Sequence, residues 1–468
     1  MFTTSEIAAF AKGLRGQLLR PGDDIYDEAR RVWNGMIDNR PALIVRAAGA
    51  ADVIQAVEFA RESGLVLAVR GGGHNVSGNA VCDGGLTLDL SLMRSVRVDP
   101  KRQSLRAEGG TLWRDLDHEA AALGLATTGG LISSTGIAGL TLGGGLGWLM
   151  GSYGLACDNL LSVDLVTAAG ELVTASASEN ANLFWGLRGG GGNFGVATSL
   201  EYRLHPVGPM LGGLIIHPLE QAADLFRFYE AFTREAPDAL GSMLLFVTSP
   251  DGKRVAALAV CYNGPPEEGE VLLAPLRAFG SPLADTIGPM RYTKIQQMFD
   301  EGFPAGLQNY WRSSFLEYLD SDGIEAIVER FRHAPSPQAA IAIEQLGGAV
   351  ARVSAEDTAF NHRASRFNLL ILGMWPERHA KAENVGWVQS ISEALAPNAS
   401  SRVYVNYLGQ NGDEGVGRVE AAYGPEAYAR LVALKNKYDP ENLFRLNQNI
   451  QPTTSGRAKE KEYRNGRP

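Results

Sequence analysis

The segment that decides the fold is VRGGGHNVSGNAVCDGGLTLDLSLM, residues 69–93. A short apolar run leads into three consecutive glycines, residues 71–73, and the chain returns to an alternating strand at residues 86–90. Glycines adopt backbone angles that a Cβ atom disfavours, and they let main-chain N–H groups come close to a ligand. Successive N–H groups in such a turn form a concave anion site, so we expect a phosphate or pyrophosphate there. Holding phosphate does not require an imidazole, and His74 beside the glycines therefore indicates a second role.

The residues before this loop predict a β-α-β unit. An irregular stretch extends through Asn39, and residues 42–45 then read as a strand. Residues 52–63 carry apolar side chains at helical spacing, with Gly64 as the stop, and residues 65–69 read as a second strand. The glycine loop thus follows the end of a strand, where α/β proteins commonly bind ligands.

Length and composition bound the class of protein. The chain has 468 residues and 45% hydrophobic residues, which predicts a globular protein of two domains. Its net charge is −9 and its pI about 5.4, so we expect neither nucleic acid nor a membrane as a partner. Cys82, Cys157 and Cys261 are too few and too widely spaced for a disulfide framework or a CxxC site. Since no signal peptide or long apolar run is evident, we expect a cytoplasmic protein.

Two further glycine-rich segments follow. Residues 127–154, TTGGLISSTGIAGLTLGGGLGWLMGSYG, combine dense glycine with recurring Leu, Ile and Trp, as expected for backbone packed around a bound ring system. Residues 188–195, RGGGGNFG, contain the G-x-G-x-x-G pattern of dinucleotide-binding folds, which must follow a strand and open a helix. Here a helical stretch, residues 182–187, precedes the pattern and a strand-like run, residues 196–204, follows it. We therefore reject the Rossmann interpretation.

The character of the sequence changes at HPVGP, residues 205–209, where we place a domain boundary. Beyond it the glycine density falls, and helices alternate with strands of two-residue period. We expect a sheet with one face on helices and the other towards a ligand. The expected helices are residues 223–234 and 323–332, and the expected strands are residues 243–247, 255–261, 339–344 and 368–374. Residues 404–407, YVNY, read as a strand and residues 426–437 as an amphipathic helix.

Four motifs in order resemble the berberine-bridge-enzyme-like flavoprotein oxidases, a group within the vanillyl-alcohol-oxidase or PCMH-type FAD superfamily. They are RGGGHN (70–75), LFWGLRGGGGNFG (183–195), YVNY (404–407) and KYDPENLFRLNQNI (437–450). Within the group the chain most resembles bacterial members, among them an oxidase of a hydroxylated nicotine and an oxygenase that works through a flavin-N5-oxide.

The resemblance implies an α+β protein with a PCMH-type FAD-binding domain of two α/β subdomains. A substrate domain with an antiparallel sheet covered by helices would complete it. We expect the FAD-binding domain at residues 1–207, with its PCMH-type core at about 37–207, and the substrate-binding domain at residues 208–402. Residues 403–468 would form a C-terminal segment that returns to the FAD domain and contains the berberine-bridge-like motif at 403–450.

The resemblance also places the pyrophosphate of FAD on the loop from Arg70 to His74. His74 aligns with the histidine that forms an 8α-histidyl bond to the flavin in this family; a histidine here can otherwise hydrogen-bond a phosphate or fill space. Plant-type relatives add a second bond from a cysteine, but Ile132 stands at that position, so we predict a single covalent link. The predicted FAD-binding residues are Arg70, Gly71, Gly72, Gly73, His74, Asn75, Ser77, Gly78, Gly130, Ser134, Thr135, Gly136, Gly139, Gly143, Gly144, Gly145, Val196 and Asn449.

Four residues are candidates for the catalytic chemistry: Tyr404, Asn406, Tyr407 and Glu344. On a strand, Tyr404 and Asn406 would share one face and Tyr407 would lie on the other, so one tyrosine or Asn406 could reach the site while the remainder is core. Glu344 ends an apolar strand, where a carboxylate must be paired or face a cavity because burying an unpaired charge is costly. Burial there would raise the pKa of its carboxyl towards that of a general base. A solvent-exposed glutamate at the strand edge is the alternative.

Further residues enter through the resemblance. Glu344 stands where a relative carries an active-site glutamate, and Thr135 where one lines the oxygen side of the flavin. Asn449 resembles a residue near the flavin, with polar packing as the alternative. The histidines show no HxH or HExxH spacing, which predicts no metal site. The side chains expected to shape the substrate pocket include Phe246, Tyr310 and Trp311.

Three functions are compatible with these residues. The first is an oxidase that moves a hydride from a carbon next to O or N of a small molecule onto FAD, with dioxygen reduced to hydrogen peroxide. The second is a flavin-dependent oxygenase of the N5-oxide type, and the third is a noncatalytic flavin-binding protein. We expect a small-molecule substrate and dioxygen as partners, and either a monomer or a homodimer.

Overall fold

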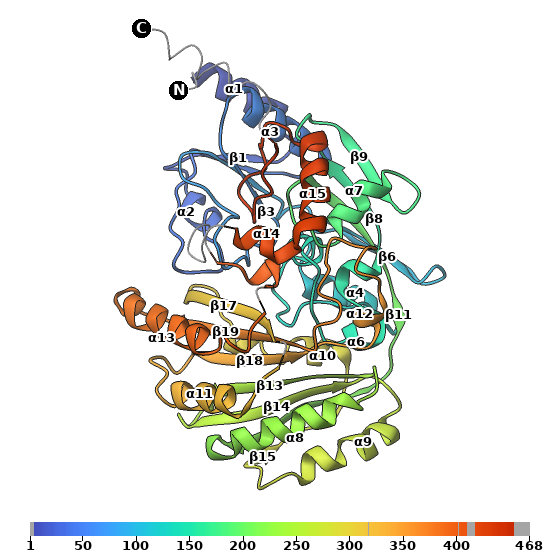
Figure 1. Ribbon diagram of the computed structural model, residues 1–468. Coiled ribbons are helices and arrows are strands. Elements are labelled where there is room, and N and C mark those ends of the chain that lie inside the picture. Colours follow the sequence, from blue (N-terminus) through green and yellow to red (C-terminus); the bar gives the residue numbers. More distant parts are fainter. Residues whose placement is uncertain (1–3, 317, 401, 410–416, 454–468) are drawn as a thin grey trace.

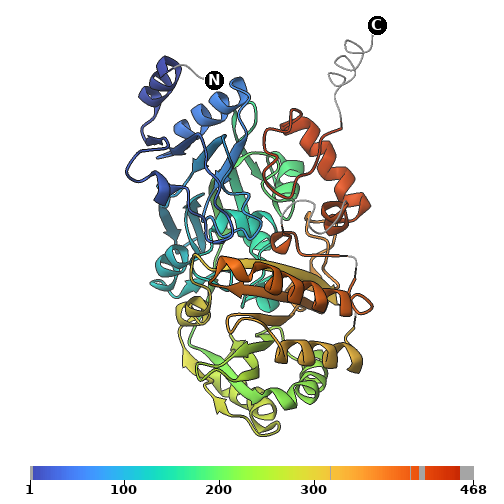
Figure 2. The same cartoon turned by 90° about the vertical axis from the view of Figure 1, so that its left-hand side faces the viewer.

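The computed structural model describes residues 4–316, 318–400, 402–409 and 417–453. Two sheets form the upper body in Figure 1 and a third forms the lower body, as the turned view of Figure 2 also shows. The predicted α+β class is confirmed. Of the predicted C-terminal segment 403–468, residues 410–416 and 454–468 lie outside the described residues, and the domain limits themselves stay predictions.

The first sheet is built around the predicted β-α-β unit. β2 and β3 both run parallel to β4, and α3, which connects β2 to β3, packs on this sheet. In the first turn of this helix, the Asp52 side chain accepts hydrogen bonds from the backbone N–H groups of Ala48, Arg15 and Gly16, and Gly64 at φ 64° ends the helix as predicted. β3 therefore delivers the glycine loop at its carboxyl end. The sheet order is β1 (Gln17–Leu19), β2 (Leu43–Arg46), β4 (Leu86–Asp89) and β3 (Leu67–Arg70), with helices α1 (Thr4–Gly13), α2 (Tyr26–Ala29) and α3 (Ala50–Glu62).

The second sheet is antiparallel throughout. Its order is β5 (Val96–Asp99), β6 (Ser104–Glu108), β10 (Val196–Arg203), β8 (Leu160–Val166) and β9 (Leu172–Ser176). β8 and β9 form a hairpin, with Gly170 at φ 82° in its turn. Helix α7 (Ala181–Leu187) precedes the third glycine cluster and β10 follows it, so the rejection of a dinucleotide-binding turn is confirmed. The region also holds α4 (Trp113–Ala121), α5 (Ile137–Leu142), α6 (Met150–Tyr153) and the short pair β7 (Leu125–Ala126) and β11 (His205–Pro206).

The third sheet has the predicted two faces. Leu244, Phe246 and Ile343 pack under the covering helices, whereas their neighbours Met243 and Leu245 point to the opposite face, towards the glycine-rich segments. Figure 1 shows α8, α9 and α11 on the side away from those segments. The strand order is β15 (Ala284–Asp285), β12 (Met210–Pro218), β14 (Arg254–Tyr262), β13 (Leu240–Thr248), β18 (Ala340–Gln345), β19 (Phe367–Trp375) and β17 (Gln308–Leu316), with β16 (Gly288–Met290) also paired to β12. Its helices are α8 (Ala222–Arg234), α9 (Pro266–Ala278), α10 (Tyr292–Gln296), α11 (Ser321–Arg332), α12 (Ala349–Arg352) and α13 (Lys381–Ala394).

The strand predicted at residues 404–407 is wrong. Residues Val405–Tyr407 form a 3₁₀ turn, η5, closed by a hydrogen bond from the Tyr407 N–H to the Tyr404 carbonyl (2.9 Å). The Asn406 amide donates to the backbone carbonyl of Leu140 (3.0 Å), which seats the turn against the second glycine-rich segment. As a result Tyr404, Asn406 and Tyr407 all face one cavity, and the predicted division between two strand faces does not occur.

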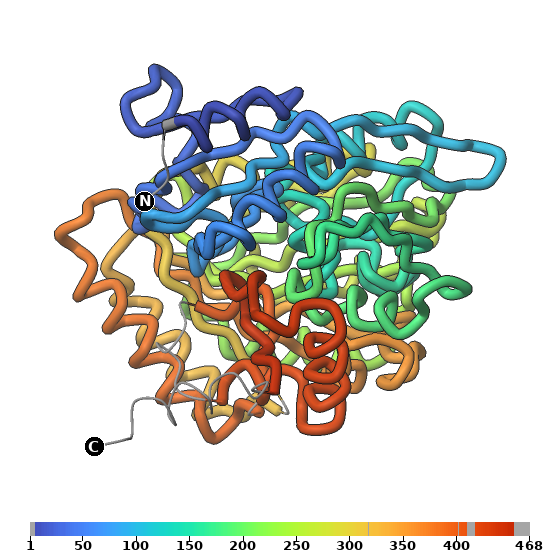
Figure 3. The backbone as a smooth tube through the Cα atoms, turned by 90° about the horizontal axis from the view of Figure 1, so that it is seen from above, coloured from blue at the N-terminus to red at the C-terminus, as the bar shows by residue number. Residues whose placement is uncertain are grey.

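The C-terminal helices α14 (Arg418–Tyr423) and α15 (Pro425–Tyr438) return to the upper body, beside α7 (Figures 1 and 3). Lys435 in α15 has no exposed surface, and its ammonium donates to the Asp439 carboxylate (2.7 Å) and to the carbonyls of Asn193 and Phe444 (2.9 Å each). Asp439 also accepts the backbone N–H groups of Leu443 and Phe444. One buried ion pair thus fastens the C-terminal motif to the third glycine cluster.

Replacing Lys435 with methionine is expected to lower the free energy of unfolding by about 3–5 kcal/mol, because it leaves the Asp439 carboxylate buried without its counter-charge. Denaturant unfolding followed by circular dichroism measures this loss. Lys437→Met, two residues further on at an exposed position, is the matched control. Equal unfolding midpoints for the two variants would contradict the assigned role of the ion pair.

Candidate functional site

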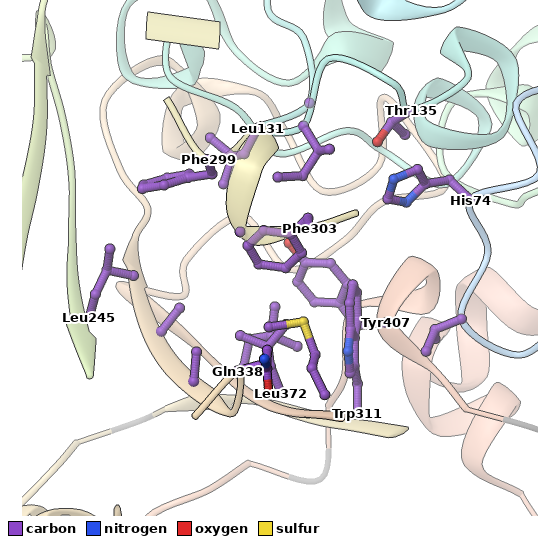
Figure 4. Close-up of a pocket in the computed structure, with 18 of the residues that line it drawn as sticks. His74, Leu131, Thr135, Leu245, Phe299, Phe303, Trp311, Gln338, Leu372 and Tyr407 are labelled. Atoms are coloured by element: carbon purple, nitrogen blue, oxygen red, sulfur yellow. The ribbon is translucent and has the colours of Figure 1, made fainter. Parts of the chain in front are cut away.

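A cavity of about 700 Å³ lies between the open face of the third sheet and the first two glycine-rich segments. Alternate side chains of β13, β18 and β19 line it from the sheet, among them Leu245 and Leu372. His74 and Thr135 line it from the opposite side, and Phe303 projects between them and the sheet (Figure 4). The loops expected to hold FAD and the sheet expected to hold substrate therefore share one space.

The imidazole of His74 is held in place by stacking. Its ring lies on the indole of Trp33, with centroids 4.3 Å apart and planes 17° from parallel. The Nε2 atom is buried and has no hydrogen-bond partner among the described residues. Burial lowers the pKa of His74 to about 4, while a backbone hydrogen bond and the Asp300 carboxylate oppose this, so the ring is neutral at pH 7. A neutral, unpartnered imidazole nitrogen at a cavity wall is available to bond a ligand.

The first two glycine-rich segments are in direct backbone contact with each other. A Cβ atom on Gly72 would lie 2.3 Å from the Gly136 nitrogen, and one on Gly136 would lie 2.4 Å from the Gly72 nitrogen. Any side chain at either position would push the segments apart. The contact holds the main chains of both segments at the cavity wall, which suits a cofactor that carries a phosphate and a flat ring.

The predicted FAD-binding residues divide into two sets. Those that line the cavity are Gly71, Gly72, His74, Asn75, Gly130, Thr135, Gly136 and Gly139. Those that do not are Arg70, Gly73, Ser77, Gly78, Ser134, Gly143, Gly144, Gly145, Val196 and Asn449. Asn449 has a buried Oδ1 atom that finds no hydrogen-bond partner within the described ranges, which marks a polar position that a ligand can complete.

The side chain of Arg70 is used by the fold itself. Its guanidinium donates to the backbone carbonyls of Ala29 and Arg31 and lies 3.4 Å from the Asp89 carboxylate. It therefore braces the start of the loop, and only its backbone is available to a cofactor. Ser77 and Gly78 line a separate cavity of about 300 Å³ beneath the loop.

Gly143, Gly144 and Gly145 lie behind the catalytic candidates. A Cβ atom on Gly143 would lie 2.1 Å from the Asn406 side chain, and the Gly145 N–H donates to the Tyr404 hydroxyl oxygen (2.8 Å). Asn406 donates to the same hydroxyl oxygen (2.8 Å). Burial raises the pKa of Tyr404, so this phenol stays protonated, and it serves mainly to join the turn to the glycine segment.

Glu344 is buried and doubly hydrogen-bonded at the edge of the cavity. The Asn368 amide donates to Oε2 (2.7 Å), and the Tyr407 hydroxyl donates to Oε1 (3.1 Å). Burial raises the pKa of Glu344 to about 7, while the two hydrogen bonds oppose that rise. Both Glu344 and Tyr407 line the cavity, so the carboxylate can act as a base near neutral pH, directly or through the Tyr407 hydroxyl.

Several site residues were missed by sequence reasoning. Trp33 stacks on His74, and Asn34 joins the Val76 and Asn309 carbonyls (2.7 and 2.9 Å) between the first and third sheets. Asp300 accepts hydrogen bonds from the Ser133 N–H and hydroxyl (2.8 and 2.6 Å) and so ties η3 (Asp300–Gly302) to the second glycine segment. The only available signal was a Trp-Asn-Gly tripeptide inside the irregular stretch before Asn39.

The expected pocket-shaping residues are only partly correct. Trp311 lines the cavity, but Phe246 and Tyr310 pack on the helix-covered face of the sheet. Among the described residues there is no group of three or more side chains that could hold a metal ion. None of the helices in the described ranges has the length and apolar character to span a bilayer.

Comparison with protein families identifies two regions. Residues 41–176 match the FAD binding domain family, and residues 403–451 match the berberine and berberine-like family. The first range contains the first two glycine-rich segments, and the second contains the η5 turn and the buried Lys435–Asp439 ion pair.

Individual relatives match over nearly the whole chain. An FAD-linked oxidoreductase from Dictyostelium discoideum is 33% identical over 96% of this chain and 97% of its own. The (R)-6-hydroxynicotine oxidase of Paenarthrobacter nicotinovorans is 33% identical over 94% of this chain and 98% of its own. The crystal structure of 6-hydroxy-D-nicotine oxidase from Arthrobacter nicotinovorans superposes with a TM-score of 0.86 at 32% identity, covering 94% of this chain and 98% of that one.

Proposed function

Because this chain belongs to the berberine-bridge-like FAD-linked oxidoreductases, we propose that it is an oxidase of a small molecule. When bound, FAD would take a hydride from a substrate carbon next to O or N and pass the electrons to dioxygen, giving hydrogen peroxide. The protein's own part is to hold the cofactor, orient the substrate and remove a proton. Two of the relatives are named as oxidases of a hydroxynicotine, which supports a small-molecule substrate for this chain.

The Glu344–Tyr407 pair is the observation that carries the proposal. Hydride loss from a C–O–H or C–N–H group also requires loss of the proton on O or N. Tyr407 donates its hydrogen to Glu344, so the lone pairs of its oxygen are left to accept a substrate hydrogen. Glu344, with its pKa near 7, receives the proton either through Tyr407 or by direct contact.

The cofactor would be held by residues of both glycine-rich segments. Backbone N–H groups near Gly72 and Gly136 would bind the pyrophosphate, and Asn449 would add a side-chain contact. His74 would form the one covalent link, since Ile132 has no sulfur to offer for a second. Trp33 would fix the plane of the imidazole.

Oxygen stoichiometry tests the proposed oxidase. The holoprotein is mixed without oxygen with a panel of amines and alcohols, and a substrate is recognised because it bleaches the visible absorption of the flavin. In air, each such substrate is expected to yield hydrogen peroxide in a one-to-one ratio with the oxygen consumed. Bleaching without oxygen uptake would indicate a dehydrogenase instead.

A second candidate, a flavin-dependent oxygenase, is favoured by the position of Thr135. Its side chain lines the cavity on the same side as His74, next to where the ring of the cofactor would lie (Figure 4). A hydroxyl there can donate a hydrogen bond to bound dioxygen. Incorporation of ¹⁸O from labelled dioxygen into the product would support this function, and its complete absence would support the oxidase.

We further expect the protein to act in the cytoplasm, as a monomer or a homodimer. Cys82, Cys157 and Cys261 are all free and buried, which is compatible with a reducing compartment. Size-exclusion chromatography with light scattering measures the oligomeric state directly.

A further inference from the structure

The substrate half of the cavity has an apolar wall. Strands β13, β18 and β19 present Met243, Leu245, Ala342, Leu370 and Leu372 to it. These positions alternate with the helix-facing residues, so the apolar surface is a continuous face of the sheet and no polar side chain interrupts it between its ends.

Polar groups gather at the two ends of this face. At the inner end Glu344 pairs in register with Met243 of β13, next to Tyr407. At the outer end Thr248 is the last residue of β13. The exposed Gln338, labelled in Figure 4, precedes β18. Since a strand rises about 3.3 Å per residue, the four steps from Met243 to Val247 span roughly 13 Å. An elongated molecule can therefore extend from the base to the mouth of the cavity.

Alanines make room along this path. In register across the sheet, Ala257 faces Leu245, Leu245 faces Ala342, and Ala342 faces Leu370. Small side chains thus alternate with large ones and form a trough between the leucines. Ala340 continues the trough towards the mouth, opposite Leu372.

The charges of the cavity have one sign. Glu344 at the inner end and the exposed Glu301 near Phe303 are its carboxylates, and no Lys or Arg is found among the described residues that line it. His74 is neutral, so no cationic group is present to balance an anion. An anionic group of a substrate that lies on the strand face would therefore be buried against hydrocarbon without a cationic side chain to pair with, which is costly.

We propose that the substrate is an elongated, mostly hydrocarbon or aromatic molecule, with one hydroxyl- or amine-bearing carbon at its inner end and no anionic group. This inference rests on the proposed oxidase function for the identity of the reacting carbon. The trough accepts the apolar body, Glu344 and Tyr407 meet the reacting group, and the mouth accommodates a polar tail or solvent.

The same wall argues against carbohydrates. A sugar ring carries several hydroxyl groups, and those lying on the leucine and alanine surface would lose their water without gaining partners. Each buried hydroxyl left unpaired lowers affinity by roughly 5- to 150-fold. A sugar could be bound only by its edge at the inner end, where few polar groups are present.

A homologous series tests the inference on the holoprotein. Unbranched primary amines and alcohols of increasing length, a matched series of ω-hydroxycarboxylates, and glucose and cellobiose are titrated without oxygen, with perturbation of the flavin spectrum as the measure of binding. We expect affinity to rise about four-fold per added methylene, as for burial of a CH₂ group, until the trough is full. We expect the hydroxycarboxylates to bind at least ten-fold more weakly than alcohols of the same length.

Ala342→Phe tests whether the trough is the site of the length-dependent binding, because the phenylalanine ring would fill the trough. It should weaken the longest ligands by at least ten-fold relative to the shortest, whereas Ala382→Phe at an exposed position of α13 should not change this ratio. If the phenylalanine variant does not retain flavin, Ala342→Leu provides the same comparison with a smaller intrusion.

The outcomes separate the two proposals. Length-dependent binding without bleaching would uphold the substrate class and reject the oxidase. Bleaching by sugars or hydroxycarboxylates, or affinity independent of length, would overturn the substrate class while leaving the oxidase intact.

Discussion

Replacing Glu344 with glutamine is expected to lower kcat/KM by about 10²- to 10⁴-fold, the usual contribution of a positioned general base. Glutamine keeps the shape of the side chain and can still hydrogen-bond Asn368 and Tyr407, but it cannot accept the substrate proton. Steady-state oxygen consumption with an identified substrate measures the effect. Glu325→Gln on the exposed side of α11 is the matched control.

The pH dependence of kcat/KM provides a second test of Glu344 as the base. A base must be ionised to act, so kcat/KM of the wild-type protein should rise with pH and level off above about 7, the pKa of Glu344. The hydrogen bond from Tyr407 favours the ionised carboxylate, so Tyr407→Phe should move the profile to higher pH. The residual activity of Glu344→Gln should not follow this ionisation. A glutamine variant with the wild-type profile would remove Glu344 from the mechanism.

Stability offers an independent check on the same residue. The pKa of Glu344 is raised in the folded state above its ordinary 4.5, so the folded protein binds the proton more tightly than the unfolded chain. Its contribution to stability is therefore largest below pH 4.5 and is lost as the pH rises through about 7. Glu344→Gln lacks this loss and should unfold no more easily than wild type at pH 8. Loss of activity in a variant of normal stability then reports on chemistry and not on folding.

Replacing His74 with alanine is expected to abolish covalent attachment of the flavin. After denaturation in acid and electrophoresis, the wild-type band should fluoresce under ultraviolet light and the His74→Ala band should not. Backbone contacts of the glycine-rich segments remain in the variant, so the native protein should still bind FAD reversibly and lose it on dialysis. The physical basis for this result is the neutral imidazole at the cavity wall, whose Nε2 has no partner in the part of the chain that the structure describes.

Two control variants distinguish the role of His74 in flavin attachment from general effects of mutation. His118→Ala, at an exposed position of α4, should retain the fluorescent band. Trp33→Ala removes the stacking partner of the imidazole and should slow attachment without preventing it. A nonfluorescent wild-type band would show that the cofactor is not covalently bound, and a fluorescent His74→Ala band would assign the link to another residue.

Much of the fold could be predicted because its signals are local. The β-α-β unit before the glycine loop, the β8–β9 hairpin and the strands of the third sheet depend on periodicity and turn residues within a few positions. The order of helix, glycine cluster and strand around residues 188–195 was enough to reject a dinucleotide-binding turn. Alternation along β13 and β18 likewise predicted a sheet with two different faces.

The errors have a common cause. Tyr404-Val405-Asn406-Tyr407 has strand-forming residues, but its hydrogen-bond partners lie in the second glycine segment and not on a sheet edge. Phe246 and Tyr310 are aromatic and were expected in the pocket, yet register places them towards the helices. In each case a contact distant in sequence overrode the local preference.

The candidate site, like the fold, could be predicted from the sequence only where its signals are local. RGGGHN and the glutamate that ends AIAIE were visible in the sequence, because glycine loops and buried carboxylates are unusual wherever they occur. The sequence by itself therefore determined that a glycine loop carries a histidine, and it marked Glu344, at the end of an apolar strand, as a candidate base. Only the tertiary structure decided that Trp33 stacks on that histidine, that Tyr407 donates to Glu344, and that an apolar trough joins them. These depend on side chains from separate elements meeting in space, which no local pattern encodes.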